Sequence, residues 1–148
     1  MQRLRDSRKT GAFSAKGELM SFIDAIKSYF KNYATFKGRA RRSEFWFTVL
    51  FTFLVSAALS IVFPGPTEMV WDMEVEQSSA AENLWSLATI VPSLAVTWRR
   101  LHDVGRSGKY FFFILIPIAG IIMLLIELTK DSQPGENQFG PSVKQIAR

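Results

Sequence analysis

The single histidine of this chain lies among charged residues. The sequence has 148 residues, and His102 sits in the run "TWRRLHDVGR", two positions after Arg100 and directly before Asp103. A histidine beside an aspartate is the pair that activates a nucleophile in many enzymes, and an imidazole with carboxylates is a common metal-binding set. The residue types therefore raise three alternatives for this cluster, which are catalytic, metal-binding and structural.

Neither the catalytic nor the metal-binding set is complete here. His102 and Asp103 have no neighbouring nucleophile, because Ser107 is placed to cap the helix that follows. A metal ion would have one imidazole and one carboxylate, and Arg99 and Arg100 are spaced to bind that carboxylate along a helix. The chain has no cysteine, which excludes thiolate ligands. We therefore expect no enzymatic activity, no metal and no cofactor.

Three apolar stretches must position these charges. Residues 45–63 contain no charged residue over 19 positions. At about 1.5 Å per helical residue this length matches a hydrocarbon core of roughly 30 Å. Residues 110–128 begin with a similar uncharged run, and residues 80–98 carry one acid, Glu82, at their outer end. The sequence predicts three transmembrane helices, at residues 45–63, 80–98 and 110–128.

The charges are unevenly distributed along the chain. Of the 18 Lys and Arg residues, 11 precede position 45, whereas residues 64–83 contain five acids and no basic residue. Basic residues near a span stay on the cytoplasmic side of a membrane. The N-terminus and the loop 99–109 are therefore predicted to be cytoplasmic, the acidic loop outside, and the C-terminus periplasmic or extracellular after three crossings. Trp71 in the acidic loop either dips into the headgroups or packs against the helices.

An amphipathic segment precedes the first span. After Ser21 apolar residues recur at helical spacing, polar residues such as Lys27 fall between them, and Ser21 with Asp24 resembles a capping box. We predict a short interfacial helix that lies on the inner membrane surface, packs against the cytoplasmic ends of the spans, or does both. Residues 1–19 show no periodicity and are predicted to be a poorly ordered basic segment, which leaves Met1 or Met20 as the start.

Two prolines lie inside the later spans. Pro92 and Pro117 each remove a backbone donor, so both spans are predicted to kink, and Pro92 frees the carbonyl of Ala88 for neighbouring hydroxyl groups. If the chain turned back at Pro117 and Gly120, its tail would lie inside, near the arginines. We predict a full crossing instead, because the third apolar run is long enough to span the membrane.

Nine residues at the cytoplasmic ends form a candidate anionic-lipid or structural motif. Ser43 is placed to cap the first span, and Gly105 to end the second. Asp103 near that helix end is disfavoured by the helix dipole, so Arg99 and Arg100 are expected to hold it in place. The arginines either bind anionic headgroups, at about 1 kcal/mol for each basic residue, or anchor the chain through internal ion pairs. The candidate residues are Arg39, Arg41, Arg42, Glu44, Arg99, Arg100, His102, Asp103 and Arg106.

Three blocks of the sequence resemble a known family. They are "FKGRARRSEFW" from residue 36, "PSLAVTWRRLHDVGRSGK" from residue 92 and "GENQFGP" from residue 135. Their order and spacing are similar to those of the bacterial inner-membrane family called domain of unknown function 805, over roughly residues 21–141. The resemblance implies a small multi-pass inner-membrane protein with no established activity, and it includes His102 without giving it a role.

The sequence therefore predicts an all-α membrane protein, in which three transmembrane helices follow a short amphipathic interfacial helix. Residues 20–141 form the multi-pass domain, and residues 142–148 form a short C-terminal tail. We expect a protein of the bacterial inner membrane that acts through a membrane-protein partner or as a homo-oligomer. An oligomeric transporter or channel and a protein that binds anionic lipids are the alternatives. The lipid bilayer is an expected partner, and nucleic acid is not.

Overall fold

Between residues 20 and 143 the chain forms five helices and one small sheet. The computed structural model describes these residues, so the predicted poorly ordered segment 1–19 and residues 144–148 of the predicted tail lie outside it. The predominance of helix agrees with the prediction, but the fold is not all-α, because two strands pair in the acidic loop. In chain order the elements are α1 (Phe22–Lys31), α2 (Arg42–Val62), β1 (Thr67–Val70), β2 (Met73–Glu76), α3 (Ala80–Asp103), the 3₁₀ helix η2 (Gly108–Leu115) and α4 (Ala119–Thr129).

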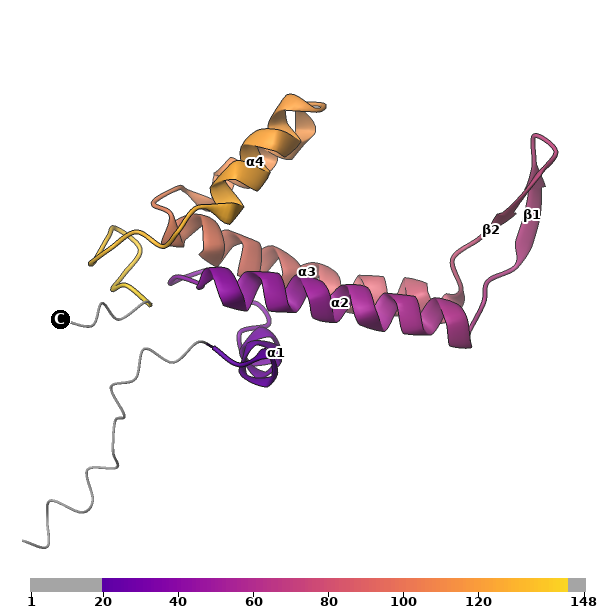
Figure 1. The fold of residues 1–148 in the computed structure, drawn as a ribbon, viewed down its shortest axis with the longest axis horizontal. Coiled ribbons are helices and arrows are strands. Elements are labelled where there is room, and N and C mark those ends of the chain that lie inside the picture. The colour runs from indigo at the N-terminus through magenta and orange to yellow at the C-terminus, as the bar shows by residue number, and fades with distance from the viewer. Residues whose placement is uncertain (1–19, 144–148) are drawn as a thin grey trace, which may run out of the picture.

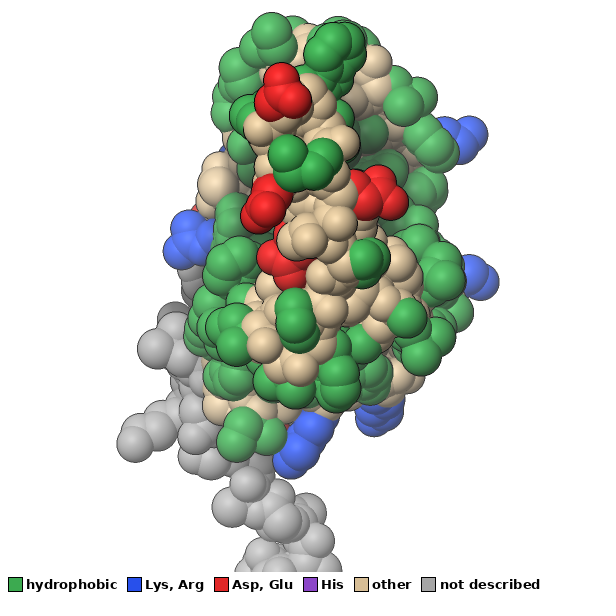
Figure 2. Space-filling view, turned by 90° about the vertical axis from the view of Figure 1, so that its right-hand side faces the viewer, with side chains coloured by type: hydrophobic (Ala, Val, Ile, Leu, Met, Phe, Trp, Pro, Cys, Tyr) green, Lys and Arg blue, Asp and Glu red, His purple; other side chains and the backbone are tan. Residues whose placement is uncertain are grey.

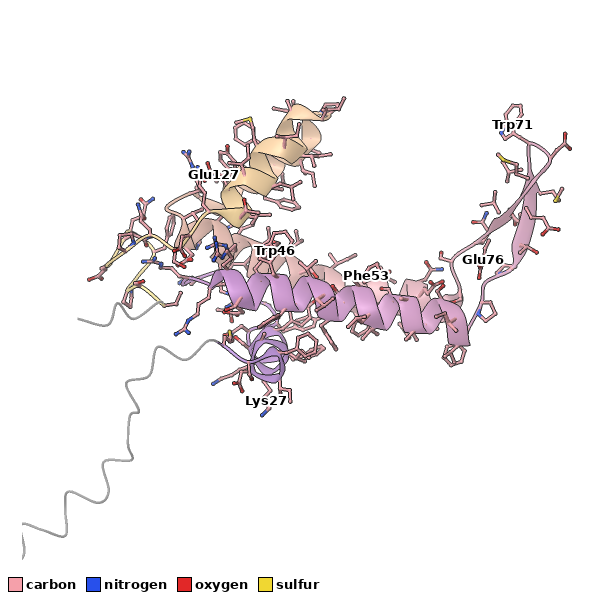
Figure 3. All side chains as sticks on the ribbon, viewed as in Figure 1. Lys27, Trp46, Phe53, Trp71, Glu76 and Glu127 are labelled. Atoms are coloured by element: carbon pink, nitrogen blue, oxygen red, sulfur yellow. The ribbon has the colours of Figure 1, made fainter. Side chains whose placement is uncertain are left out.

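α2 and α3 run antiparallel, side by side, and form the long axis of the molecule (Figure 1). α2 has 21 residues and α3 has 24, which correspond to about 31 Å and about 36 Å of helix. Both predicted spans in this region are therefore helical. Among the described residues, α2 is the one helix that is both long and apolar enough to cross a membrane. Phe53 in its middle is exposed on the helix surface (Figure 3).

α1 lies crosswise to this pair and packs against it (Figure 1). Its start is the predicted one, because the Ser21 hydroxyl accepts a hydrogen bond from the Asp24 N–H at 3.1 Å. Two tyrosines bind the α3 backbone beside Pro92: the Tyr33 hydroxyl donates to the freed Ala88 carbonyl at 2.6 Å, and the Tyr29 hydroxyl donates to the Thr89 carbonyl. α1 therefore packs against α2 and α3, which agrees with one of its two predicted placements, but its contacts reach the middle of residues 80–98 and not only the predicted cytoplasmic end.

The third predicted span is not a continuous helix. η2 ends at Leu115 and α4 begins at Ala119, so two short arms run back to back (Figure 1). Pro117 lacks the N–H that would continue the helix, and Ile118 adopts a φ of 60°, in the left-handed region. The prediction of a transmembrane helix over residues 110–128 is therefore wrong. The chain turns back at Pro117, and the length of the apolar run gave no sign of this.

Gly120 closes this turn. Its N–H donates to the Ile116 carbonyl at 3.1 Å, and a Cβ at this position would overlap the carbonyl oxygen of Phe113. Glycine therefore allows α4 to lie directly against the end of η2.

Because the chain turns back, the residues after α4 return to the end where α2 begins and α3 ends (Figure 1). The Gln133 N–H donates to the Asp103 carbonyl at 3.0 Å, which joins residues 130–143, from here on called the tail, to the end of α3. The predicted separation of the tail from the arginines by a third crossing is therefore wrong.

β1 and β2 form an antiparallel hairpin at the opposite end of α2 and α3 (Figure 1). Trp71 and Asp72 make its turn with φ values of 52° and 62°. A two-residue turn with positive φ at both central residues has a twist that matches the right-handed twist of the two strands it joins. Trp71 is 91% exposed, so it does not pack against the helices, which was one of its two predicted placements.

Candidate functional site

Asp103 lies at the centre of a buried ion network at the end of α3. Arg39 Nε donates to its Oδ1 at 2.9 Å, and Arg100 Nη1 donates to its Oδ2 at 2.6 Å. These three side chains are at most 1% exposed. The predicted contact with Arg100 is confirmed. The predicted contact with Arg99 is wrong, because Arg39, from the segment before α2, takes that place.

The same two arginines hold the tail. Arg39 Nη1 donates to the carbonyl oxygens of Gly135 at 2.8 Å and Gly140 at 3.3 Å, while its Nη2 donates to the Gln133 carbonyl. Arg100 donates to the carbonyls of Leu128, at 3.1 Å, and Lys130. Guanidinium groups carry five N–H donors in a fixed plane, so one arginine can bind a carboxylate and several carbonyls together. The network therefore connects three distant segments of the chain.

A second buried pair joins α2 to α3. Arg99 Nη1 lies 2.9 Å from Glu44 Oε1, which also accepts a hydrogen bond from the Ser28 hydroxyl of α1 at 2.9 Å. Glu44 is in the first turn of α2, as predicted. Arg99 Nε and Nη2 are buried and have no hydrogen-bond partner within the described residues, so this pair is less completely satisfied than the Asp103 network.

His102 also contacts the tail, beside the network. Its ring stacks on that of Phe139, with centroids 3.8 Å apart and an interplanar angle of 3°. Its Nδ1 lies 3.1 Å from the Gly38 carbonyl, which only accepts, so Nδ1 carries the proton. The Asn137 amide donates to the backbone carbonyl of His102 at 2.9 Å. These contacts make His102 part of the surface on which the tail docks.

Acid is expected to weaken this docking by protonating His102. This residue lies outside the predicted crossing at residues 80–98. Burial lowers the pKa of His102 from 6.5, and the hydrogen bond to Gly38 opposes the shift. The unfolded chain therefore gains this proton at a higher pH than the folded one, so the free energy of unfolding falls as the pH drops below 6.5. Thermal unfolding in detergent micelles should show a loss of stability in mild acid that His102→Gln lacks. Equal losses in both proteins would contradict the assignment.

The remaining candidate residues lie outside the buried network. Arg106 Nη2 is 3.1 Å from Glu127 Oε1, and Lys130 Nζ is 2.8 Å from the same oxygen (Figure 3 labels Glu127). Both cations are about half exposed, so these pairs contribute little to stability. Arg41 is half-buried and Arg42 is exposed at the start of α2.

The predicted helix caps give a mixed result. Ser107 caps η2 by accepting a hydrogen bond from the Lys109 N–H, as predicted. Gly105, with a φ of 78°, follows the end of α3, also as predicted. Ser43 does not cap α2, because the helix already begins at Arg42 and Arg41 is its cap residue.

The contribution of the tail to this site was not predicted. Its carbonyl groups and the side chains of Asn137 and Phe139 complete the network. The "GENQFGP" block was the one feature of the sequence that could have indicated this role. Within residues 20–143 no group of three or more His, Asp or Glu side chains could hold a metal ion. Apart from Arg99 Nε and Nη2, the site consists of paired charges and satisfied hydrogen bonds, an arrangement that fixes segments in place.

Comparisons with known proteins agree with the resemblance found in the sequence. Residues 33–141 match the family described as Protein of unknown function (DUF805). The chain is 34% identical over 117 residues to inner membrane protein YhaI of Escherichia coli K12, which covers 79% of this chain and 92% of that protein. It is 32% identical over 122 residues to inner membrane protein YhaH of the same strain, covering 82% and 98%.

A further relative is named an uncharacterized protein, YiiR of Escherichia coli K12, at 26% identity over 76% of this chain and 88% of that protein. No solved structure matches the chain. The Arg39, Arg100 and Asp103 network lies within the matched residues 33–141. The chain belongs to the DUF805 family, whose function is unknown.

Proposed function

We propose that this chain is an integral protein of the bacterial inner membrane that has no catalytic activity and acts through a membrane-protein partner or through self-association. In this arrangement α2 and residues 80–98 of α3 cross the membrane, and η2 with α4 enters from the cytoplasmic side as a re-entrant hairpin. The observation that carries the proposal is the return of the tail to the buried arginine network.

The exposed apolar side chains support insertion in lipid. Large hydrophobic residues are exposed along α2, α3, η2 and α4. A soluble monomer rarely presents contiguous apolar patches of more than a few hundred Å². Lipid tails cover such a surface without a protein partner. The mean hydropathy of the whole chain hides this pattern, because the charges are collected at one end and in the hairpin.

The lengths of the elements support the re-entrant arrangement. α4 has 11 residues, or about 16 Å of α-helix, and η2 has eight, or about 16 Å at the larger rise of a 3₁₀ helix. Each arm therefore reaches about half the depth of a hydrocarbon core of roughly 30 Å. η2 begins and α4 ends beside the arginine network, and the turn between the two arms lies at their far ends. At the network end, Arg42 and Arg106 are exposed and can contact anionic headgroups.

The chemistry of the network favours a structural over a catalytic role. Asp103 and Glu44 are each bound by arginine, and His102 is fixed between a carbonyl and an aromatic ring. A general base needs a free lone pair near a reacting proton, and a nucleophile needs a base beside it. With its proton on Nδ1, His102 keeps a lone pair on Nε2, but within the described residues its ring contacts Gly38 and Phe139 and not a nucleophile.

Reporters fused to each terminus test the topology. Reporters active only in the cytoplasm are expected to be active at both the N-terminus and the C-terminus, because two crossings and one re-entrant hairpin return the chain to its starting side. An active N-terminal and inactive C-terminal fusion would restore a third crossing and contradict the proposal. Crosslinking in native membranes that recovers neither a partner nor a self-pair would contradict the proposed mode of action.

A further inference from the structure

The β1–β2 hairpin is amphipathic although it stands apart from the helices. Residues directly opposite in an antiparallel pair share a face, so the register places Val70 with Met73 and Val75 with Glu68 on one side. We call this the apolar face of the hairpin. The other face carries Glu74 and Glu76 with two further residues, Met69 and Thr67.

Nothing in the described part of the chain covers the apolar face. All eight strand residues are exposed. A lone two-stranded hairpin is at best marginally stable in water, and exposed Val and Met side chains add nothing to its stability there. A surface that covers one face would therefore stabilise this hairpin.

The base of the hairpin fixes its direction. The Gln77 N–H donates to the Pro66 carbonyl at 2.9 Å, and a Cβ on Gly65 would overlap the Gln77 carbonyl oxygen. The segments that lead into β1 and out of β2 are therefore in close contact. α3 then starts within three residues of Gln77, at Ala80, with a capping box between Ser79 and Glu82. The hairpin is consequently joined to α2 and α3 through short, well-bonded segments.

The hairpin lies crosswise to α2 and α3, at the end remote from the arginine network (Figure 1). An element that lies along a membrane surface has this direction relative to helices that cross the membrane. Figure 2, which views the molecule from this end, shows acidic side chains on both sides of the hairpin with hydrophobic side chains between them. Trp71 stands at the tip (Figure 3).

We propose that the apolar face of the hairpin lies on the outer surface of the bilayer, against zwitterionic headgroups, with Glu74 and Glu76 directed to water. This inference rests on the proposed crossing by α2 and α3. Val62 and Leu84 are likewise exposed at the adjacent helix ends, so a lipid surface would cover apolar side chains of all three segments. Trp71 has the side chain that the membrane interface favours.

Charge distinguishes this occupant from the alternatives. The segment from Pro64 to Asn83 has five acids and no Lys or Arg, so two copies of the hairpin repel each other and an anionic surface repels both. Zwitterionic headgroups carry no net charge and accept the apolar face without that repulsion. A basic protein segment would pair with Glu74 and Glu76, but it would leave the apolar face, on the opposite side of the hairpin, exposed to water.

Single cysteines test the proposal, because the protein has none of its own. Met73→Cys and Glu74→Cys place a polarity-sensitive fluorophore on opposite faces of the same strand, and Phe53→Cys places one in the middle of α2. The labelled proteins, with helical content equal to the parent, are reconstituted in phosphatidylcholine vesicles and quenched with iodide. We expect the label at residue 73 to be blue-shifted and several-fold less quenched than the label at residue 74.

The label on α2 separates failure of this inference from failure of the proposed function. Water-like emission at residue 73 with lipid-like emission at residue 53 would overturn the hairpin placement and leave the crossing intact. Water-like emission at both would overturn the membrane crossing itself. Shielding of residue 73 in native membranes but not in lipid vesicles would indicate a protein partner. If the shielding of residue 73 disappeared when each vesicle held a single protein molecule, the hairpin would be covered by a second copy of the protein. A protein partner or a second copy would each overturn the assignment to lipid.

Discussion

Replacing Asp103 with asparagine is expected to lower the free energy of unfolding by about 3–5 kcal/mol, the cost of breaking a buried ion pair by removing one partner. Asparagine keeps the size of the side chain but leaves Arg39 and Arg100 without a counter-charge where both are almost fully buried. Removing one buried charge is more costly than the net value of the pair, because the remaining charges stay desolvated. The tail should detach as well, because Asp103 no longer holds Arg39 and Arg100 in the positions from which they bind its carbonyl groups.

Unfolding in detergent micelles by heat or by added SDS measures this loss. Asp72→Asn is the matched control, because it makes the same change at the exposed turn of the hairpin, where asparagine tolerates positive φ. The double variant Arg39→Gln with Asp103→Asn should be less destabilised than the sum of its single changes, since it leaves fewer unpaired charges. Equal stability of Asp103→Asn and Asp72→Asn would show that the network does not hold this end together.

Features set by neighbouring residues were predictable from the sequence. The start of α1 at Ser21, the end of α3 before Gly105 and the cap of η2 at Ser107 each depend on a bond or a backbone angle within four residues. The contact between Arg100 and Asp103 is one turn of one helix. These signals are local, so they do not need knowledge of how the helices pack.

Pairings between distant segments were not predictable. Arg39 and Asp103 are 64 residues apart, and Arg99 and Glu44 are 55 apart. The sequence offers several arginines near each acid along the helices, and helical spacing favours Arg99 for Asp103. Packing of α1 and α2 against α3 decides otherwise, because it places Glu44 beside Arg99 and leaves Asp103 facing the segment before α2.

The third apolar run shows why composition does not determine topology. A crossing helix and a re-entrant hairpin both expose apolar side chains to lipid, so residues 110–128 satisfy either arrangement. The difference lies in backbone geometry at Pro117, Ile118 and Gly120. The small sheet was missed for a related reason, since strands of four residues produce only a brief alternation, as in "MEVE" from Met73.

Gly120→Ala is the second change with a large expected effect, because it acts on this turn. The added methyl group would overlap the Phe113 carbonyl oxygen, which belongs to the backbone and cannot rotate away as a side chain does. Overpacking of this kind costs about 1–3 kcal/mol where neighbours can adjust, and we expect the upper part of that range here. The two arms must separate to accommodate the methyl group, so the tip at Leu115 should move relative to α4.

A cysteine at residue 115 detects that movement. A fluorophore at this position should change its emission in lipid vesicles when Gly120→Ala is added, while the free energy of unfolding in micelles falls. Ala119→Val is the control, since it adds more volume at the neighbouring, exposed position of the same helix. If both variants behaved like the parent, close contact between η2 and α4 would not be required. A continuous third helix would then again be compatible with the chain, because such a helix accepts alanine at position 120 as readily as glycine.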